Sequence, residues 1–376
     1  MEEWEEIVGR HRSAYEKMTL QDAVKLVYQN EFGAEHLLAD EAAAHDMLAH
    51  EYDEIGGHRC EAMFEPIGNG LCRMHMNAAG FDQTDLFLLE KLFFRTAGKK
   101  RGSRAALLRK LKRLGLFRFY GMHKGADAVS ELADYVRTGV PSIRHSREFR
   151  EAYQPHYRVV EQKYADCYAV LRWIAQYREK EKCVIAIDGR CGSGKTTLAQ
   201  RIQEIFGCGV IHMDDFFLPQ DMRTEKRMSE PGGNVHYERV KDEVLKPLCA
   251  GVTVRYRPYD CMAGVLGDAR EIQDRDLNIV EGAYALHPAL HEYYTDSMVL
   301  DVAEKVQKER IVLREGNLGA GVFFEKWMPL EQRYIDGCGI YEQAGAIFES
   351  GADGSIKKIA KQLKYTEKER EKENEE

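Results

Sequence analysis

The sequence has no cysteine pair of the C-x-x-C type, and its nine cysteines are scattered along 376 residues. Structural zinc sites usually draw on closely spaced cysteines and histidines, so this absence argues against a zinc-dependent fold. Cys60 and Cys72 lie near His58 and His75 in the sequence, which leaves a metal hypothesis beside the alternative of buried or idle thiols. Unpaired thiols fit a reducing compartment, and we expect a cytoplasmic protein.

The chain also lacks a long apolar run and an excess of positive charge. No apolar stretch approaches the roughly 20 residues that span a bilayer, and the acidic start MEEWEEIVGR does not have the layout of a secretory signal. We therefore expect no membrane partner. The formal net charge of -8 makes nucleic acid an unfavoured partner. A local basic segment from Lys99 to Lys112 either contacts phosphate or nucleic acid, or is a solvated helix face.

At this length we expect two domains, because single hydrophobic cores seldom grow beyond about 250–300 residues. Residues 1–155 predict a mostly α-helical domain of unknown role, either a ligand-sensing or substrate-positioning domain or an oligomerisation module. In TLQDAVKLVYQN, apolar residues recur at helical spacing, and Thr19 with Asp22 forms a capping box. FEPIGNGLCRMHMN predicts a turn before a short strand. We interpret four histidines as surface or core residues rather than metal ligands: His36, His45, His50 and His75.

From residue 156 onward the pattern changes twice. Over 156–182, the residues Val160, Tyr164 and Leu171 lie on one helical stripe, which predicts a long linking helix. Over 183–363, helical segments alternate with strand-like runs, namely CVIAID, GVIHMD, VTVRY, LNIVEG and SMVLDV. This alternation predicts an α/β fold with a parallel sheet and helices on both faces. Residues 364–376 are nearly all polar and predict a disordered tail.

The stretch IDGRCGSGKTTLAQ matches the pattern G-x-x-x-x-G-K-[ST] and lies between a strand-like and a helix-like run. Its glycines permit backbone angles that point successive N–H groups into one concavity, and the helix adds the positive end of its dipole. These features predict a P-loop NTPase that binds ATP. Lys195 is expected at the β- and γ-phosphates, and the Thr196 hydroxyl at Mg²⁺. The predicted nucleotide-binding residues are Gly189, Gly192, Ser193, Gly194, Lys195, Thr196 and Thr197.

Acidic residues follow two further strand-like runs. Asp214 and Asp215 come after GVIHM, and a carboxylate at the carboxyl end of a strand lies on the same rim as the phosphate loop. Either aspartate is suited to accept a proton from an attacking hydroxyl or to hold Mg²⁺ through water; the alternative is helix capping. Glu281 ends the run LNIVE and is a candidate for completing the Mg²⁺ shell.

Two arginines complete the candidate site. Arg310 and Arg314 are four residues apart and so share a helix face. On a mobile helix they would close over the nucleotide and stabilise negative charge in the transition state. The alternative is that they pair with surface acids such as Glu309 and Glu315.

The order of these pieces, over residues 183 to about 350, resembles the uridine kinase and phosphoribulokinase family of P-loop kinases. MDDFF resembles the family's Asp-x-Phe-Tyr segment and RPYDC its Tyr-Asp-Phe segment; VEGAYALHP and the arginine pair follow in the family's order. The resemblance implies that Asp214 is the general base and that the arginines belong to a lid. The candidate sets are catalytic Asp214, Lys195, Arg310 and Arg314; metal-binding Thr196, Glu281 and Asp214; and substrate-binding Phe217, Tyr259 and Arg257.

The chain departs from the family at the acceptor side. DCMAGVLGD lacks the His and Arg that follow Tyr-Asp-Phe in nucleoside-selective members, GGNVHYERV replaces an Asp-His-Pro segment, and Phe217 stands where a tyrosine is usual. These changes weaken uridine as the substrate and leave the phosphoryl-transfer groups intact. EKWMPLEQRYI either forms part of a different acceptor pocket or packs in the core, through Trp327, Pro329, Glu331 and Tyr334.

The sequence therefore predicts a uridine-kinase-like phosphotransferase, which uses ATP and Mg²⁺ to phosphorylate an alcohol group of a small molecule. The acceptor stays unassigned, and a homo-oligomer is compatible with the sequence. The alternative is a nucleotide-binding regulatory module whose helical half binds a protein or RNA partner through the basic segment. A pure sensor needs neither a general base nor lid arginines, so the candidate residues favour the kinase.

Overall fold

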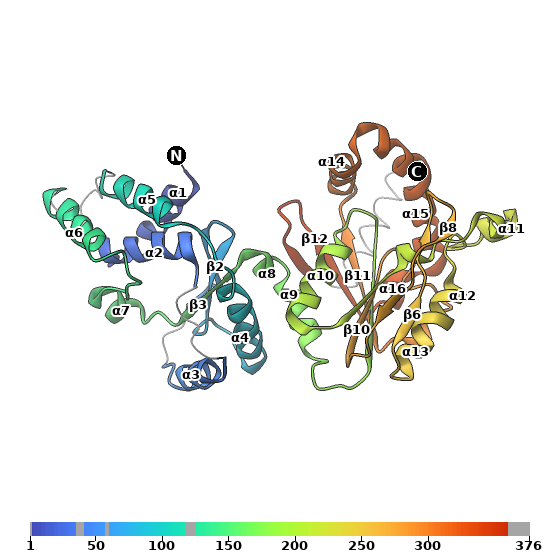
Figure 1. Ribbon diagram of the computed structural model, residues 1–376, viewed down its shortest axis with the longest axis horizontal. Helices are drawn as coiled ribbons and strands as arrows, with labels where there is room; N and C mark the ends of the chain where they lie inside the picture. The colour runs from blue at the N-terminus through green and yellow to red at the C-terminus, as the bar shows by residue number, and fades with distance from the viewer. Residues whose placement is uncertain (1, 35–40, 57–59, 117–124, 360–376) are drawn as a thin grey trace. The chain divides into compact units, whose positions relative to one another are not determined.

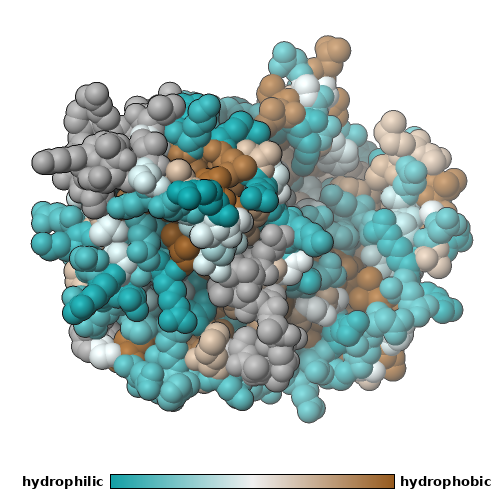
Figure 2. Space-filling view, turned by 60° about the vertical axis from the view of Figure 1, so that its left-hand side comes forward, coloured by the Kyte–Doolittle hydropathy of each residue, from teal (hydrophilic) through white to brown (hydrophobic). Residues whose placement is uncertain are grey.

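The computed structural model describes residues 2–34, 41–56, 60–116 and 125–359 (Figure 1). The chain divides into two compact units, Met1–Ala165 and Asp166–Glu376. The tail predicted over 364–376, together with His36 and His58, lies outside the described residues. Within the described ranges, no helix has both the length and the apolar character that crossing a membrane requires. The face drawn in Figure 2 is mostly hydrophilic, with apolar side chains in small separate groups.

The first unit is mostly helical and contains one small antiparallel sheet. Its elements are α1 (Glu3–Ala14), α2 (Leu20–Phe32), α3 (Glu41–Asp53), β1 (Phe64–Gly68), β2 (Leu71–His75), α4 (Gln83–Ala97), α5 (Arg104–Leu116), α6 (Gly125–Arg137), α7 (Arg147–Tyr153) and β3 (Tyr157–Glu161). The sheet has the order β1-β2-β3. The predicted capping box is present, because Thr19 and Asp22 exchange bonds at the start of α2. The strand predicted after FEPIGNG is β2.

Residues 156–182 do not form the single helix that the sequence predicts. β3 pairs antiparallel with β2, from Leu71↔Glu161 to His75↔Tyr157, and two short helices follow, α8 (Gln162–Asp166) and α9 (Tyr168–Ala175). The β-branched residues Val159 and Val160 are buried in this sheet. The helical spacing of the segment was misleading because pairing with β2 buries these side chains better than a helix would.

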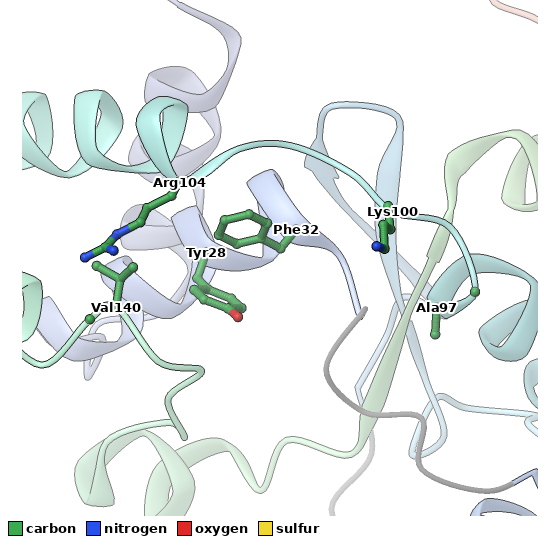
Figure 3. A pocket seen from close by; sticks show the side chains of 8 residues that line it. Tyr28, Phe32, Ala97, Lys100, Arg104 and Val140 are labelled. Carbon is green, nitrogen blue, oxygen red and sulfur yellow. The ribbon is translucent and has the colours of Figure 1, made fainter.

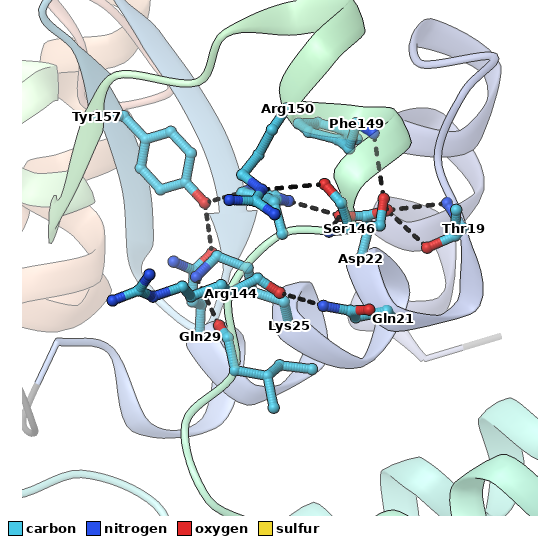
Figure 4. Close-up of polar contacts among 12 residues, drawn as sticks. Thr19, Gln21, Asp22, Lys25, Gln29, Arg144, Ser146, Phe149, Arg150 and Tyr157 are labelled. Carbon is cyan, nitrogen blue, oxygen red and sulfur yellow. Dashed lines mark hydrogen bonds and ion pairs between the residues drawn. The ribbon is translucent and has the colours of Figure 1, made fainter.

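A buried polar network joins α2 to the segment that precedes α7 (Figure 4). The Asp22 carboxylate, 1% exposed, accepts bonds from Thr19 N and Oγ1 at 3.0 and 2.8 Å and from Ser146 N and Oγ at 3.0 and 2.6 Å. His145 Nδ1 lies 2.7 Å from Asp22, and its Nε2 lies 2.6 Å from the Tyr157 hydroxyl. Burial lowers the pKa of His145 to about 4, so the ring is neutral at neutral pH.

The second unit is built on a six-stranded sheet of order β13-β12-β11-β4-β10-β5. Its elements are β4 (Cys183–Asp188), α10 (Lys195–Phe206), β5 (Gly209–His212), η2 (Met213–Phe216), η3 (Gln220–Met222), α11 (Glu225–Ser229), α12 (Tyr237–Arg239), η4 (Val240–Leu245), α13 (Lys246–Cys249), β6 (Val254–Tyr256), β7 (Tyr259–Asp260), β8 (Val265–Leu266), β9 (Arg270–Ile272), β10 (Leu277–Glu281), η5 (His291–Tyr293), β11 (Asp296–Val302), α14 (Glu304–Val322), η6 (Phe323–Trp327), α15 (Met328–Cys338), α16 (Ile340–Gln343), β12 (Ala346–Ser350) and β13 (Ile356–Ile359). All pairings in the sheet are parallel except that of β13 with β12.

Four of the five predicted strands lie in this sheet, as β4, β5, β10 and β11. The fifth, VTVRY, is β6, and it pairs only with β9 in a separate two-stranded ribbon. Its central residue Arg255 is exposed while Val254 and Tyr256 are buried. That alternation is typical of a two-stranded ribbon with one solvent-exposed face, whereas a strand inside a parallel sheet is buried on both faces.

Helices cover both faces of the sheet. On one face α10 packs against β5 and β10, and α9 packs against β13. On the other face, Val184, Val280 and Val299 enter a hydrophobic core with apolar residues of η4, α13, α15 and α16. A parallel sheet covered in this way, with a glycine-rich loop between β4 and α10, is a P-loop NTPase fold of the α/β class. It places the ends of β4, β10 and β5 side by side at one edge (Figure 1).

Candidate functional site

The glycine-rich loop leaves the central strand β4 and leads into α10. Gly189 and Gly194 have φ angles of 139° and 101°, which side chains rarely adopt. A Cβ atom on Gly189 would lie 2.1 Å from the carbonyl oxygen of Leu300 on β11, so only glycine fits there. The Lys195 ammonium donates to the carbonyl oxygens of Gly189 and Arg190, each at 2.8 Å. These bonds hold the ammonium over the loop, where phosphate would bind.

Glu281 lies at the end of β10, between the loop and β5. The strand register pairs it with Ile187 of β4 and with His212 of β5. Its buried carboxylate accepts a hydrogen bond from Thr196 Oγ1 at 3.1 Å. His212 Nδ1 lies 2.5 Å from the same carboxylate, and this hydrogen bond raises the pKa of His212. The Thr196 hydroxyl and the Glu281 carboxylate are oxygen donors of the kind that Mg²⁺ prefers, so both fit a magnesium site.

The two aspartates that the sequence leaves as alternatives have different surroundings. Both lie in η2, directly after β5. Asp215 is buried and accepts hydrogen bonds from the Tyr256 hydroxyl at 2.8 Å and from Arg270 at 2.5 Å. Asp214 is exposed at the rim, and in the described part of the chain no group hydrogen-bonds to its carboxylate. Asp215 therefore holds β9 in place, while Asp214 is left available.

The electrostatic surroundings of Asp214 suit a proton acceptor. Desolvation by the walls of the site raises the pKa of its carboxyl group, and the neighbouring negative charge of Glu281 acts in the same direction. Lys195 and His212 oppose this shift. A carboxylate with a raised pKa binds a proton more readily than an ordinary aspartate, which is what a general base requires.

Asp188 is a site residue that the sequence analysis does not single out. It ends β4, and its carboxylate accepts hydrogen bonds from Gly189 N at 2.6 Å, Leu286 N at 2.7 Å and the Tyr334 hydroxyl at 2.6 Å. Burial raises its pKa to about 6 despite these bonds. Asp188 thus ties the phosphate loop to the VEGAYALHP segment and to α15. The sequence contained a signal for this residue, because Asp188 is an acid that ends the apolar run CVIAID directly before the glycine-rich loop.

α15 also brings a carboxylate to the phosphate loop. Glu331 is buried, and its two oxygens lie 3.1 and 3.0 Å from the backbone nitrogen of Cys191, which donates to them. The segment EKWMPLEQRYI is therefore not simple core packing, because Glu331 contacts the loop and Tyr334 contacts Asp188. A carboxylate on a loop N–H occupies a position that suits an anionic phosphate oxygen.

Glu331→Gln is expected to tighten ATP binding roughly tenfold, which corresponds to about 1.4 kcal/mol. Glutamine keeps an oxygen that accepts from Cys191 N, but it removes a buried negative charge beside the polyphosphate. Isothermal titration with ATP and Mg²⁺ measures the change. Glu325→Gln, at an exposed position in η6, is the matched control and should bind as the unaltered protein does. Weaker ATP binding by Glu331→Gln alone would contradict the prediction.

The two arginines of the predicted lid are not brought together. Arg310 NH1 donates to the carbonyl oxygens of Gly192 and Ser193, both at 3.2 Å, so its guanidinium lies against the outside of the loop. Arg314 instead pairs with Glu315 at 2.6 Å and has an exposed side chain, which matches the surface-pair alternative. Burial lowers the pKa of Arg310. Arg310 also donates to Ser350 Oγ at 3.0 Å and to the carbonyl oxygen of Gly351 at 2.6 Å. Of the two arginines only Arg310 contacts the phosphate loop, and its action on the nucleotide stays a prediction.

The predicted acceptor residues have unequal positions. Phe217 packs against Trp327, with ring centroids 5.6 Å apart. Tyr259 is buried at the start of the hairpin β7–β8, and the rest of this hairpin lies in the segment DCMAGVLGD that departs from the family pattern. Arg257 donates to the backbone oxygens of Leu266 and Gly267 at 2.9 and 2.7 Å. Its guanidinium therefore stabilises the hairpin, and its contact with a substrate stays a prediction.

The metal hypothesis for the first unit finds no support in the described residues, where no group of three or more His, Cys, Asp and Glu side chains is arranged to hold an ion. Cys72 is fully buried, with its sulfur 3.7 Å from the carbonyl oxygen of Val160. Of the four histidines interpreted above as surface or core residues, three lie in the described part of the chain, and each is close to an acidic side chain: His45 to Glu90, His50 to Glu54 and His75 to Glu65.

No family model matches the chain, and no curated protein matches its sequence. Among solved structures, a possible uridine kinase from Bacillus stearothermophilus is 18% identical over 49% of this chain and 97% of that chain, with a TM-score of 0.38. A phosphoribulokinase from Rhodobacter spheroides is 17% identical over 44% of this chain and 69% of that chain, with a TM-score of 0.32. A shikimate kinase from Bacteroides thetaiotaomicron is 16% identical over 44% of this chain and 86% of that chain, with a TM-score of 0.24. Similarities at this level carry no conclusion about activity.

Proposed function

We propose that the protein transfers the γ-phosphoryl group of ATP to a hydroxyl group of a small-molecule acceptor. One observation carries the proposal: three neighbouring strand ends bring Lys195, Glu281 and Asp214 to the same edge of the sheet. Lys195 closes the phosphate loop, Glu281 supports the Thr196 hydroxyl, and Asp214 presents a carboxylate that no described group binds. A module that only senses a nucleotide has no use for such a free carboxylate.

The chain's own groups divide the work of the reaction. The loop N–H groups and Lys195 bind the β- and γ-phosphates, and Thr196 with Glu281 would hold Mg²⁺ beside them. Bound Mg²⁺ supplies positive charge that offsets the phosphate oxygens.

Asp214 accepts the proton of the acceptor hydroxyl as its oxygen attacks the γ-phosphorus. The new O–P bond forms as the bond between the γ-phosphorus and the β–γ bridging oxygen breaks, so the products are a phosphate ester and ADP. Afterwards the protonated Asp214 returns its proton to solvent at the exposed rim. The acceptor would enter from the side of Phe217 and the β7–β8 hairpin, where the chain departs from nucleoside-selective kinases.

The test is ADP formation by the full chain with ATP and Mg²⁺ against nucleosides, pantothenate-like alcohols and sugar-like alcohols. One acceptor class is expected to raise ADP formation above the acceptor-free rate and to give a phosphomonoester signal by ³¹P NMR. Lys195→Ala should abolish both signals, while Lys305→Ala, at an exposed position of α14, should not. ATP binding without acceptor-stimulated turnover across the three classes would sink the proposal and favour a regulatory module.

A further inference from the structure

The basic segment around α5, extended by one residue to Arg113, contains eight cations of two kinds. Four of its members form ion pairs inside the first unit: Lys99 and Arg101 with Glu161, Lys110 with Glu31, and Arg113 with Glu2 and Glu5. The other four have no acidic partner among the residues that the structure describes: Lys100, Arg104, Arg109 and Lys112. The segment is therefore not a continuous basic face for a nucleic-acid backbone, since half of its charge is neutralised internally.

Two of the four unpaired cations, Lys100 and Arg104, line one pocket of about 590 Å³ (Figure 3). Its walls come from α2, from the end of α4 and the segment that leads into α5, and from the segment after α6. Apolar side chains, among them Phe32, Ala97 and Val140, make up much of the lining. A volume of this size is within the range of roughly 300–1,000 Å³ that is usual for small-molecule sites.

An aromatic pair lies between the two cations. Tyr28 and Phe32 are one turn apart on α2, with ring centroids 5.0 Å apart and ring planes inclined by 56°. Both rings are only half-buried. Figure 3 shows them between the side chains of Arg104 and Lys100. The pocket thus offers aromatic surface for a flat ring and a positive charge on either side of it.

The remaining wall is held in a strained conformation. Val140 is buried and has a φ angle of 56°, which is exceptional for a β-branched residue, and the preceding Gly139 has 92°. Such a backbone conformation is energetically unfavourable and persists where the surroundings impose it, as at ligand sites. The Tyr135 hydroxyl fixes this segment by donating to the carbonyl oxygen of Pro141 at 2.6 Å.

We propose that this pocket binds a small molecule that joins a flat aromatic ring to a phosphate or carboxylate group. The ring packs on Tyr28 and Phe32, and the anionic group binds Lys100 or Arg104. Arginine and lysine bind such oxyanions through charge-assisted hydrogen bonds, which strengthen when a ligand ring excludes water from them. The proposal concerns the first unit alone and does not depend on the function of the second.

The probe for this site is phenyl phosphate, with inorganic phosphate and phenol as its two halves. Binding is measured by isothermal titration of the full chain. All of the titrated proteins carry the substitution Lys195→Ala, which weakens anion binding at the phosphate loop. Phenyl phosphate is expected to bind at least tenfold more tightly than either half. The double variant Lys100→Ala/Arg104→Ala should weaken this binding at least tenfold. Arg109→Ala/Lys112→Ala, on the same helix but outside the pocket lining, should leave it unchanged.

Three results would overturn the proposal. If phenyl phosphate binds no more tightly than inorganic phosphate, the rings of Tyr28 and Phe32 make no contribution to binding. If phenyl phosphate binds equally well to the variant Lys100→Ala/Arg104→Ala, the anionic group binds elsewhere. A salt-sensitive complex with a short RNA, weakened equally by both double variants, would instead indicate a nucleic-acid surface. Both cations are exposed, so a matched thermal unfolding profile of the variants shows that a loss of binding is not a loss of fold.

Discussion

Asp214→Asn is expected to lower kcat by about 10²–10⁴-fold, because the acceptor hydroxyl would lose the carboxylate that takes its proton. ATP binding should not weaken, since Lys195 and the loop N–H groups are unchanged. The folded protein favours the protonated form of Asp214, so its negative charge reduces stability at neutral pH. The neutral asparagine should therefore fold at least as stably. Steady-state kinetics, ATP titration and thermal unfolding measure the three effects.

The neighbouring Asp215 is the matched control for Asp214. Asp215→Asn removes the negative charge that pairs with Arg270 and weakens the bonds with Tyr256 and Arg270, so it should reduce stability while most of kcat remains. The pH profile gives an independent reading. Below the raised pKa of Asp214, its carboxyl group already holds a proton and does not accept another, so kcat/KM should fall toward acid pH at a higher pH than for an ordinary aspartate. Equal kcat losses in both variants would contradict the assignment of Asp214.

Asp22→Ala is expected to reduce the stability of the first unit by at least about 3 kcal/mol. The substitution leaves donors of the half-buried Thr19 and of the buried His145 and Ser146 without their acceptor. It also removes the cap of α2 and the attachment of α7 (Figure 4). Hydrogen exchange measured on peptides from residues 2–165 reports on this unit separately from residues 166–359. Protection should fall in the first set and stay unchanged in the second.

Two further variants make the Asp22 experiment specific. Asp22→Asn keeps one acceptor oxygen and should lose less protection than Asp22→Ala. Asp53→Ala, at the exposed end of α3, should lose none. Unchanged exchange in Asp22→Ala would show that the network does not stabilise the unit. Equal losses across both units would show instead that the units unfold together.

Features that depend on neighbouring residues could be predicted from the sequence. The phosphate loop is such a feature, because glycine conformation and the start of α10 are set within a few residues. The capping box of Thr19 and Asp22 is another, since its spacing is local. β4, β5, β10 and β11 were predictable because strands of a parallel sheet are apolar on both faces.

Predictions that depended on distant partners were wrong or incomplete. Segment 156–182 has helical spacing, yet β3 forms because β2 lies ready to pair with it. The charge of Arg257 did not indicate that it would bind the backbone oxygens of Leu266 and Gly267 at the end of β8, and its contact with a substrate stays a prediction. Nothing in the spacing of Glu331 indicates that it reaches Cys191, 140 residues away along the chain.

By itself, the sequence determined that the second half forms a P-loop and that acids follow the next strands. The tertiary structure decided which of those acids is free. Asp214 and Asp215 are adjacent and chemically identical, and only the positions of Tyr256 and Arg270 distinguish them. It also decided that Lys100 and Arg104 share a pocket while Lys99 and Arg101 pair with Glu161. The physical reason is that chemical type is a property of each residue, whereas burial and pairing depend on partners that only folding brings close.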